Sequence, residues 1–530
     1  MKSFDSNCPL PPEGTNFVSA PAFRGTLQIL WTCVSVLVLC TWSVVHLNVP
    51  PQIKVRSKKQ RLRRASSRVF SKIRWMLFNI LAPEWIFTKA LSDFLSVRGL
   101  RARFVAQAEK DGIPWSNAHT HFADMGGFGL SFDGLAVPQV DTDGGTIEIP
   151  ARIADIGPAD QSTAIPIEMN DNLSHDFSPS FWAKRARGLL DHNDAKRHST
   201  RLGTIFSEAN ANGQGWHMDM HNSKLVARAL DGSVIDVLGP DGQYHGDFFM
   251  NIMMLRSNLW IPNANQLLLI REMGLIASLP DIDEDDLDDR SKNNSIIKAI
   301  AITQICWFDL QFLVRFGTGM TNTQLEVMVF AFTIFSVISY TLAWDRPKGL
   351  DYTITLKATT YPKSSADMIK IAAQGPVYML TSRRPTIWIA NHWQSKGPRI
   401  LGFDLPNLSI LVAGVVTSIF GGLHCIAWHF SFPSVYEQTM WQASSIITTA
   451  SPVVVSTLAI YNLKTQSSSS RTISYSTLLL GTVASFIAIT LLVLFVAARL
   501  FILVEVFRSL GFQPPNAFKS TWTANLPHIG

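Results

Sequence analysis

The residues best suited to chemistry lie in a histidine-containing stretch near the middle of the chain. His217, Asp219 and His221 alternate with methionines, and His119 and His121 add two more imidazoles earlier in the chain. On a β-strand, alternate side chains point to one face, so the first three would converge. Imidazole and carboxylate groups bind zinc or iron, and the pattern therefore predicts a candidate metal site. The alternative is a loop with exposed or hydrogen-bonded histidines, since the longer spacing of a defined zinc site is missing.

A second candidate is Asp309, an acidic residue inside an apolar run. Ionisable groups at membrane depth suggest a functional role, such as a proton or ion relay. The alternative is a hydrogen bond between two packed helices. His424, His429 and Glu505 raise the same question near the ends of later apolar runs.

The acidic run Asp281–Asp289 resembles the paired aspartates that hold Mg²⁺ on a diphosphate, but acidic residues also favour the start of a helix. The chain has no Gly-x-Ser-x-Gly motif, phosphate-binding loop or dinucleotide glycine pattern. Neither a catalytic residue nor a cofactor is predicted.

These candidates lie in a chain whose composition is that of a membrane protein with a sizeable polar part. Of its 530 residues, 47% are hydrophobic and 16% charged, against about 25% charged in soluble domains. A helix needs about 20 apolar residues to cross a bilayer. Six runs meet that length: Leu27–Leu47, Ser295–Phe316, Thr323–Trp344, Leu408–Phe430, Trp441–Leu463 and Tyr475–Ala498, the last continuing through Phe507 as an interfacial extension.

The segment Val69–Leu95 is apolar and aromatic, but five charged residues interrupt it and Pro83-Glu84 falls near its middle. A charge at the centre of a span costs about 2.5–3.5 kcal/mol. An interfacial or re-entrant segment gives six spans, whereas a full crossing gives seven, and both remain open.

Basic residues predict the orientation. Between Pro51 and Arg74 there are ten Lys or Arg and no acidic residue, and short basic loops stay in the cytoplasm. In the six-span scheme the polar insert is also cytoplasmic, which would leave the sequons at Asn172 and Asn293 unglycosylated. The third sequon, Asn407, lies too close to a span to be used easily. The expected partners of the basic loops are the bilayer and its anionic head groups, not nucleic acid.

The predicted fold class is mainly α, a polytopic α-helical membrane protein with a small α+β insert at the membrane face. Thr146–Pro150, Lys224–Leu230 and Val234–Leu238 read as strands, Asp351–Thr359 as a further strand joining them, and Phe181–Leu190 as a basic amphipathic helix. The predicted organisation is a polar tail (1–26), a span (27–47), a basic loop with the interfacial or re-entrant segment (48–97), the insert (98–294), a two-span hairpin (295–344), a basic loop (345–406), a three-span bundle with its extension (407–508) and a tail (509–530).

Several stretches resemble a group of uncharacterised multi-pass membrane proteins of ascomycete fungi. They are Arg24–Pro50, Trp75–Trp85, His121–Phe128, Gln324–Pro347, Gly421–Trp441, Arg499–Pro515 and Thr521–Gly530. The resemblance implies a fungal membrane protein and carries no activity or catalytic residue to this chain.

The function expected is a transport, channel or membrane-sensing role in a membrane. The alternatives are a membrane-bound enzyme of lipid or secondary metabolism, which would use the histidine-rich insert, and a structural or adaptor protein that binds lipid through its basic loops.

Overall fold

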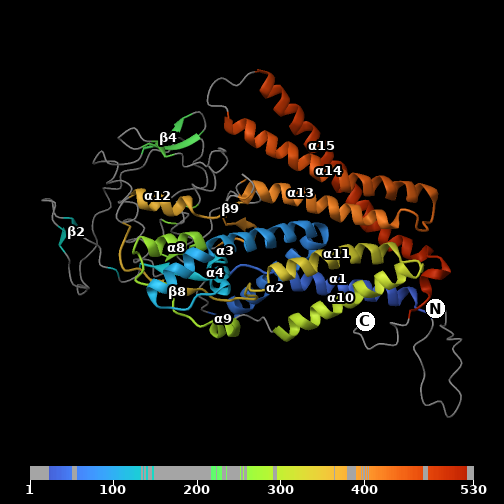
Figure 1. The fold of residues 1–530 in the computed structure, drawn as a ribbon, viewed down its shortest axis with the longest axis horizontal. Coiled ribbons are helices and arrows are strands. Elements are labelled where there is room, and N and C mark those ends of the chain that lie inside the picture. The colour runs from blue at the N-terminus through green and yellow to red at the C-terminus, as the bar shows by residue number, and fades with distance from the viewer. Residues whose placement is uncertain are drawn as a thin grey trace, which may run out of the picture.

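The computed structural model describes residues 23–50, 57–132, 259–290, 295–362, 365–378, 389–395, 405–468 and 475–521, with short pieces between them. Six of the described helices are long and apolar enough to cross a membrane. They are α1 (Thr26–Val44), α10 (Ser295–Gly317), α11 (Gln324–Leu342), α13 (Leu405–Leu423), α14 (Val435–Ser468) and α15 (Tyr475–Arg508). The first four run roughly along one direction, α14 and α15 are inclined to them, and the described parts of both termini lie at the same end (Figure 1).

We call the end of the bundle where both described termini lie the terminal end. Hydrogen bonds and an ion pair show which loops lie at this end. Arg24 pairs with Glu326 at the start of α11, and its backbone N–H donates to Phe518 O at 2.8 Å. Gln324 Nε2 donates to Ser431 O at 2.7 Å, which brings in the loop between α13 and α14. The six helices therefore alternate in direction, which places both described ends of the chain at the terminal end.

Glycines allow α13 and α14 to pack closely. A Cβ added at Gly421 would lie 2.5 Å from the backbone of Thr448, and one at Gly414 would lie 2.1 Å from Ser456 Oγ. Small residues that let helix backbones approach closely are common where membrane helices pack.

At the opposite end the chain forms a cap with its own apolar core. It contains the end of α3 (Pro83–Asp111), α4 (Asn117–Asp124), α8 (Ala264–Glu272), α9 (Glu284–Arg290) and α12 (Ser365–Ala373). These helices surround a three-stranded sheet in the order β7 (Leu259–Trp260), β1 (Phe128–Ser131), β8 (Ile354–Lys357). β1 pairs with β7 antiparallel and with β8 in parallel, with Phe128 opposite Ile354. Aromatic side chains dominate the core: Phe104, Phe122, Phe128, Phe132 and Trp260 are at most 1% exposed.

The predicted strands are confirmed where they are described. β3 (Thr146–Ile147) pairs with β2 (Gln139–Val140), and β5 (Lys224–Arg228) pairs antiparallel with β6 (Val234–Ile235). β8 comes from the predicted strand Asp351–Thr359, and it joins the insert by pairing with β1. A short hairpin of β9 (Val377–Tyr378) and β10 (Trp393–Gln394) lies further along the chain. The predicted helix Phe181–Leu190 lies outside the described residues.

The contested segment Val69–Leu95 forms parts of two helices, α2 (Lys58–Leu81) and α3, and neither is among the candidate spans. Proline lacks a backbone N–H and clashes with a preceding helical turn. Pro83 therefore ends α2 and takes the first position of α3. The break lies beside the bundle, because Ile80 and the half-exposed Leu81 line a void together with Met328 of α11.

The predicted apolar run Tyr475–Ala498 and its extension through Phe507 form one continuous helix, α15. Arg499 lies within this helix, where an acidic partner meets it. The acidic run Asp281–Asp289 starts a short helix, α9, which has Glu284, Asp285 and Asp286 in its first turn.

Candidate functional site

The break between α2 and α3 places an acidic side chain next to the last apolar helix. Glu84 lies in the first turn of α3, where a negative charge is favoured by the helix dipole. Its two carboxylate oxygens accept hydrogen bonds from Arg499 Nη1 and Nη2, both at 3.1 Å. Glu84 is 6% exposed, so the pair is largely shielded and each partner satisfies the other.

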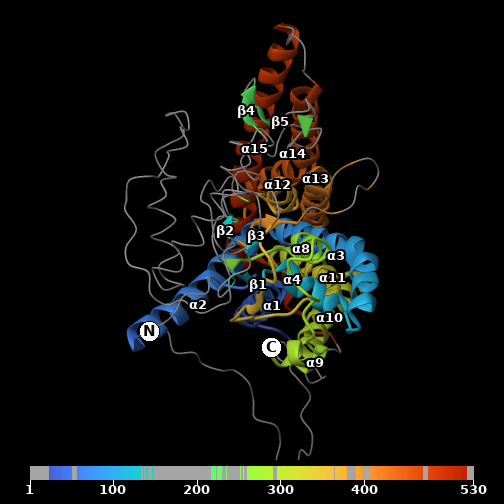
Figure 2. The same cartoon turned by 90° about the vertical axis from the view of Figure 1, so that its left-hand side faces the viewer.

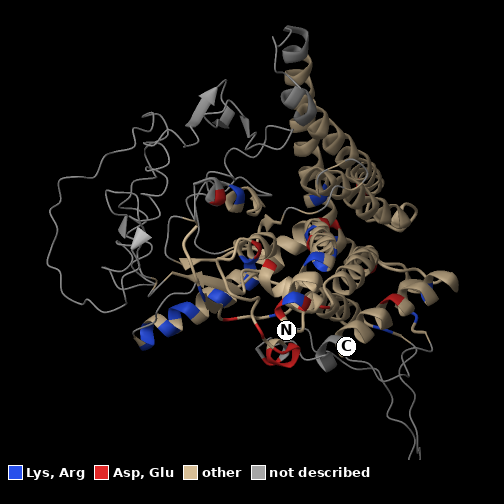
Figure 3. Ribbon diagram, turned by 60° about the vertical axis from the view of Figure 1, so that its left-hand side comes forward, with Lys and Arg blue, Asp and Glu red and all other residues tan. Residues whose placement is uncertain are grey.

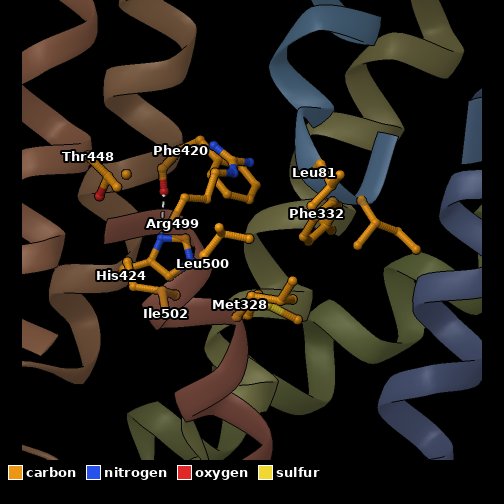
Figure 4. Close-up of a pocket in the computed structure, with 12 residues that line it drawn as sticks. Leu81, Met328, Phe332, Phe420, His424, Thr448, Arg499, Leu500 and Ile502 are labelled. Carbon is orange, nitrogen blue, oxygen red and sulfur yellow. Dashed lines mark hydrogen bonds between the residues drawn. The ribbon is translucent and has the colours of Figure 1, made fainter. Parts of the chain in front are cut away.

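Arg499 is also held by aromatic rings. Its guanidinium carbon lies 4.7 Å from the ring centroid of Phe420, and His424 Nδ1 lies 2.9 Å from Phe420 O (Figure 4). The small void beside these side chains has a volume of about 30 Å³, which suits ordered water and is too small for a larger solute. The Glu84–Arg499 pair therefore joins the start of α3 to the last apolar helix without leaving a wide pocket.

A second buried charge cluster lies where the bundle meets the cap. Lys89 Nζ donates to both carboxylate oxygens of Asp93 at 3.0 Å and to Trp393 O at 3.0 Å. Arg346, which follows α11, pairs with Asp93 and donates to Asn48 Oδ1 at 2.8 Å. Asp93 is 4% exposed and Arg346 5%. One carboxylate thus balances two buried cations from distant parts of the chain.

Hydrogen bonds from β10 and from Ser395, the residue that follows it, extend this cluster into the cap. Gln394 Nε2 donates to Ser409 Oγ of α13 at 2.8 Å and also to Ser92 Oγ of α3. Ser395 Oγ donates to Asp124 and accepts from Asn263 Nδ2 at 3.2 Å. The segment 393–395 therefore connects α3, α13 and the cap.

Two titratable groups of the cap face the same cluster with opposite effects. Burial, followed by the field of Asp93, raises the pKa of Asp124 from 3.8 to about 6. Burial, followed by the field of Arg346, lowers the pKa of His121 from 6.5 to about 4. Both are in α4 and both are buried. Asp124 therefore binds a proton more readily in the folded protein than in the unfolded chain, whereas His121 binds one less readily.

The two pKa shifts change the free energy of unfolding in opposite directions as the pH falls, so their effects partly cancel. On lowering the pH from 7 to 5, the raised pKa of Asp124 adds about 1 kcal/mol to stability and the lowered pKa of His121 removes about 2 kcal/mol. We expect His121→Gln to become more stable on this acidification relative to wild type, and Asp124→Asn to become less stable. Thermal unfolding of the detergent-purified proteins at pH 7 and pH 5 measures both. Identical pH dependence in the three proteins would contradict the assignment.

Helix α2 has two different long faces. The face toward the protein carries buried Trp75 and Asn79, and Lys72 Nζ lies 3.5 Å from the ring centroid of Trp42. The opposite face exposes large apolar side chains at helical spacing, namely Leu62, Val69, Phe70, Ile73, Leu77 and Leu81. Viewed along the bundle, α2 projects sideways from it (Figure 2).

Basic residues flank this apolar face. α2 carries eight Lys or Arg and no acidic residue, and Figure 3 shows its blue bands leaving a bundle that is mostly uncharged. Lys58, Lys59, Arg61 and Arg63 are exposed. Arg68 pairs with Asp351, and Arg64 Nη2 donates to Asp351 O at 3.3 Å. A basic helix with an exposed apolar face is typical of one that lies at a membrane surface.

The predicted site residues stand as follows. Thr333 Oγ1 of α11 donates to Asp309 of α10, so this residue makes the hydrogen bond between helices that was the alternative to a relay. His217, Asp219 and His221 lie on strand β4 (His217–His221), whose side chains are outside the described part of the protein. Among the described residues no group of three His, Cys, Asp or Glu is placed to hold a metal. The metal site stays a prediction, as do the sequons, since Asn172 and Asn293 are also outside the described residues.

The buried ion pairs of Glu84 and Asp93 were not predicted from the sequence, where the charges of Val69–Leu95 indicate only that a crossing there is costly. The spacing of Lys89 and Asp93, four residues apart on a helix, was an available signal for one pair. The partners Arg346 and Arg499 lie 253 and 415 residues away, so no local pattern indicates them.

Comparison with known proteins identifies a family but no activity. A model described as a family of unknown function (DUF8562) matches residues 5–132, 267–373 and 407–529. These ranges contain five of the six apolar helices in full, α13 from residue 407 onward, and both α2 and α3. They leave out the strand with the predicted metal ligands. No curated protein and no solved structure matches the chain. With more than half of its length matched, the chain belongs to this family of unknown function, DUF8562.

Proposed function

We propose that this is a six-span membrane protein that senses anionic lipid in the leaflet on the cap side, with α2 as the lipid-binding helix. The observation that carries the proposal is the division of α2 into a protein-facing side and an exposed apolar side flanked by basic residues. Short segments rich in Lys and Arg stay on the cytoplasmic side of a membrane. The basic residues of α2 precede α3, which ends in the cap, so this rule supports a cytoplasmic cap. The proposal includes a fungal origin for the protein, as its resemblance to membrane proteins of ascomycetes implies.

Charge and apolar area both favour the bilayer as the partner. Each Lys or Arg near an anionic membrane surface contributes about 1 kcal/mol. The exposed residues Lys58, Lys59, Arg61 and Arg63 therefore contribute about 4 kcal/mol, or about 1,000-fold in the population of the lipid-bound state. The exposed apolar side chains of α2 also favour membrane binding, because their transfer from water into the bilayer is favourable whatever the charge of the lipid.

The contacts of α2 provide a path from lipid to the rest of the protein. Its middle is held to the start of the β8 segment through Arg68 and Asp351. Its far end continues through Pro83 into α3, which the Glu84–Arg499 pair ties to the last span. Movement of α2 toward the head groups would therefore pull on both the cap and the bundle. The void of about 30 Å³ beside Arg499 gives no comparable support to a transport role.

The test uses the full-length protein in nanodiscs of phosphatidylcholine with or without phosphatidylserine. Chymotryptic cleavage after Phe70, quantified by mass spectrometry, reports whether the exposed apolar face is covered. We expect cleavage to be at least tenfold slower with phosphatidylserine at low salt, and the difference to disappear at 0.5 M salt because exposed charges are screened at high ionic strength, where the Debye length falls to about 4 Å.

Two charge variants separate α2 from a general charge effect. Replacing Lys58, Lys59, Arg61 and Arg63 with Gln is expected to abolish the dependence on phosphatidylserine. The matched control replaces four exposed basic residues of α3, Arg98, Arg101, Arg103 and Lys110, and is expected to retain it. Equal cleavage of the wild type in both lipids, or loss of the effect in both variants, would overturn the proposal.

A further inference from the structure

We propose that Ser66 in α2 is a phosphorylation site for a basophilic serine/threonine kinase, and that its phosphorylation releases α2 from the anionic leaflet. This inference rests on the proposed lipid-binding role of α2. Ser66 follows Arg63-Arg64-Ala65, so two guanidinium groups lie two and three residues before the hydroxyl. Charge patterns of this kind next to the acceptor residue determine the choice of substrate by kinases.

The position of Ser66 on the helix gives the modification its effect. Residues four apart lie on one face of a helix, and Ser66 stands midway between Leu62 and Phe70 on the exposed apolar face. Ser67 is turned about 100° away from it. The hydroxyl of Ser66 donates to Arg63 O at 3.1 Å, an exposed hydrogen bond within its own helix. Ser66 is thus both accessible and central to the lipid-facing surface.

The reaction needs only a nucleoside triphosphate and the kinase. The Ser66 Oγ attacks the γ-phosphorus of ATP and forms the new O–P bond, while the bond from that phosphorus to the β–γ bridging oxygen breaks and ADP leaves. The hydroxyl proton passes to the kinase's base. The residues from Ser57 to Arg63 are all exposed, so this end of α2 unwinds with the loss of little more than its capping box, Ser57 with Gln60. Entry of Ser66 into a kinase cleft also requires Arg64 and Arg68 to release Asp351.

Phosphorylation changes the apolar face directly. A phosphoserine carries a charge of about −1.5 to −2 at neutral pH, and here that charge would replace a hydroxyl between two large apolar side chains. It would also offset roughly two of the basic residues that attract α2 to anionic lipid, which corresponds to about a 30-fold loss of lipid-bound population. Release of a basic membrane helix by phosphorylation is an established type of electrostatic switch.

The two states exclude each other. When the apolar face lies on the leaflet, Ser66 is covered, and when Ser66 is phosphorylated the face is repelled. Linkage requires the coupling to be reciprocal. Anionic lipid should therefore slow phosphorylation, just as phosphorylation weakens lipid binding.

The experiment treats the full-length protein in nanodiscs with the catalytic subunit of cyclic-AMP-dependent protein kinase and Mg²⁺-ATP. Mass spectrometry of the α2 peptides should locate phosphate on Ser66 in phosphatidylcholine nanodiscs, with initial rates about tenfold lower when phosphatidylserine is present. Ser66→Ala should remove this phosphate and Ser67→Ala should leave it. The phosphorylated protein should lose the protection of Phe70 from chymotrypsin by phosphatidylserine.

Two phosphate mimics provide the matched comparison. Ser66→Asp is expected to weaken the phosphatidylserine-dependent protection, and Ser67→Asp, which adds the same charge beside the apolar face, to weaken it less. An unmodified Ser66 in phosphatidylcholine nanodiscs would overturn the inference, and so would full protection after its phosphorylation. If the unphosphorylated wild type shows no protection, the lipid-binding function itself is wrong. A result in which protection is intact and Ser66 takes no phosphate removes this inference alone.

Discussion

Replacing Asp93 with alanine is expected to lower the free energy of unfolding by about 3–5 kcal/mol, the usual result of removing one partner of a buried ion pair. Asp93 balances both Lys89 and Arg346, and its side chain and that of Arg346 are each 5% exposed. The variant would therefore leave two cations without a counter-charge in a buried site. Unfolding in bicelles, followed by steric trapping, measures the change.

The exposed pair Arg103–Glu272 serves as the control for Asp93. Its side chains are 55% and 38% exposed, and such pairs contribute about 0–1 kcal/mol. Glu272→Ala should therefore cost little. Similar losses for Asp93→Ala and Glu272→Ala would show that the cluster at the base of the cap is more solvated than its burial indicates. Asp93→Asn, which keeps the hydrogen-bonding shape without the charge, is expected to fall between the two.

Replacing Gly421 with alanine is expected to destabilise the packing of α13 on α14 by about 1–3 kcal/mol, the range for overpacked sites. The added Cβ would lie 2.5 Å from the backbone carbonyl of Thr448. Backbone atoms cannot turn aside, so the two helices must separate. The gain in helix propensity from Gly to Ala is roughly 0.5–1 kcal/mol and does not offset the clash.

Its neighbour Gly422 provides a control in the same turn of the same helix. A Cβ there would meet Thr449 at 3.8 Å, an ordinary contact. Gly422→Ala should therefore be neutral or slightly stabilising, whereas Gly421→Ala lowers the thermal unfolding temperature. If the two variants behave alike, α13 and α14 do not approach each other at Gly421 as closely as the structure shows.

The predictable part of the fold rests on local sequence properties. Six apolar runs of bilayer length predicted six apolar helices, and the alternating segment Asp351–Thr359 predicted the strand β8. Pro83 with its flanking charges correctly argued against a single helix through Val69–Leu95. The predicted continuation of the last apolar run through Phe507 matches α15, but the partner of Arg499, Glu84, could not be predicted because it lies 415 residues away.

By itself, the sequence determined that this is a chain of six long apolar helices with a strongly basic segment after the first, because hydrophobic length and charge density are properties of contiguous residues. Only the tertiary structure decided which charges are compatible with burial, how α2 and α3 are arranged against the bundle, and which face of α2 is exposed. Charge on residues such as Glu84 and Asp93 is costly in isolation and becomes favourable only beside Arg499 and Arg346, which the fold brings together from hundreds of residues away.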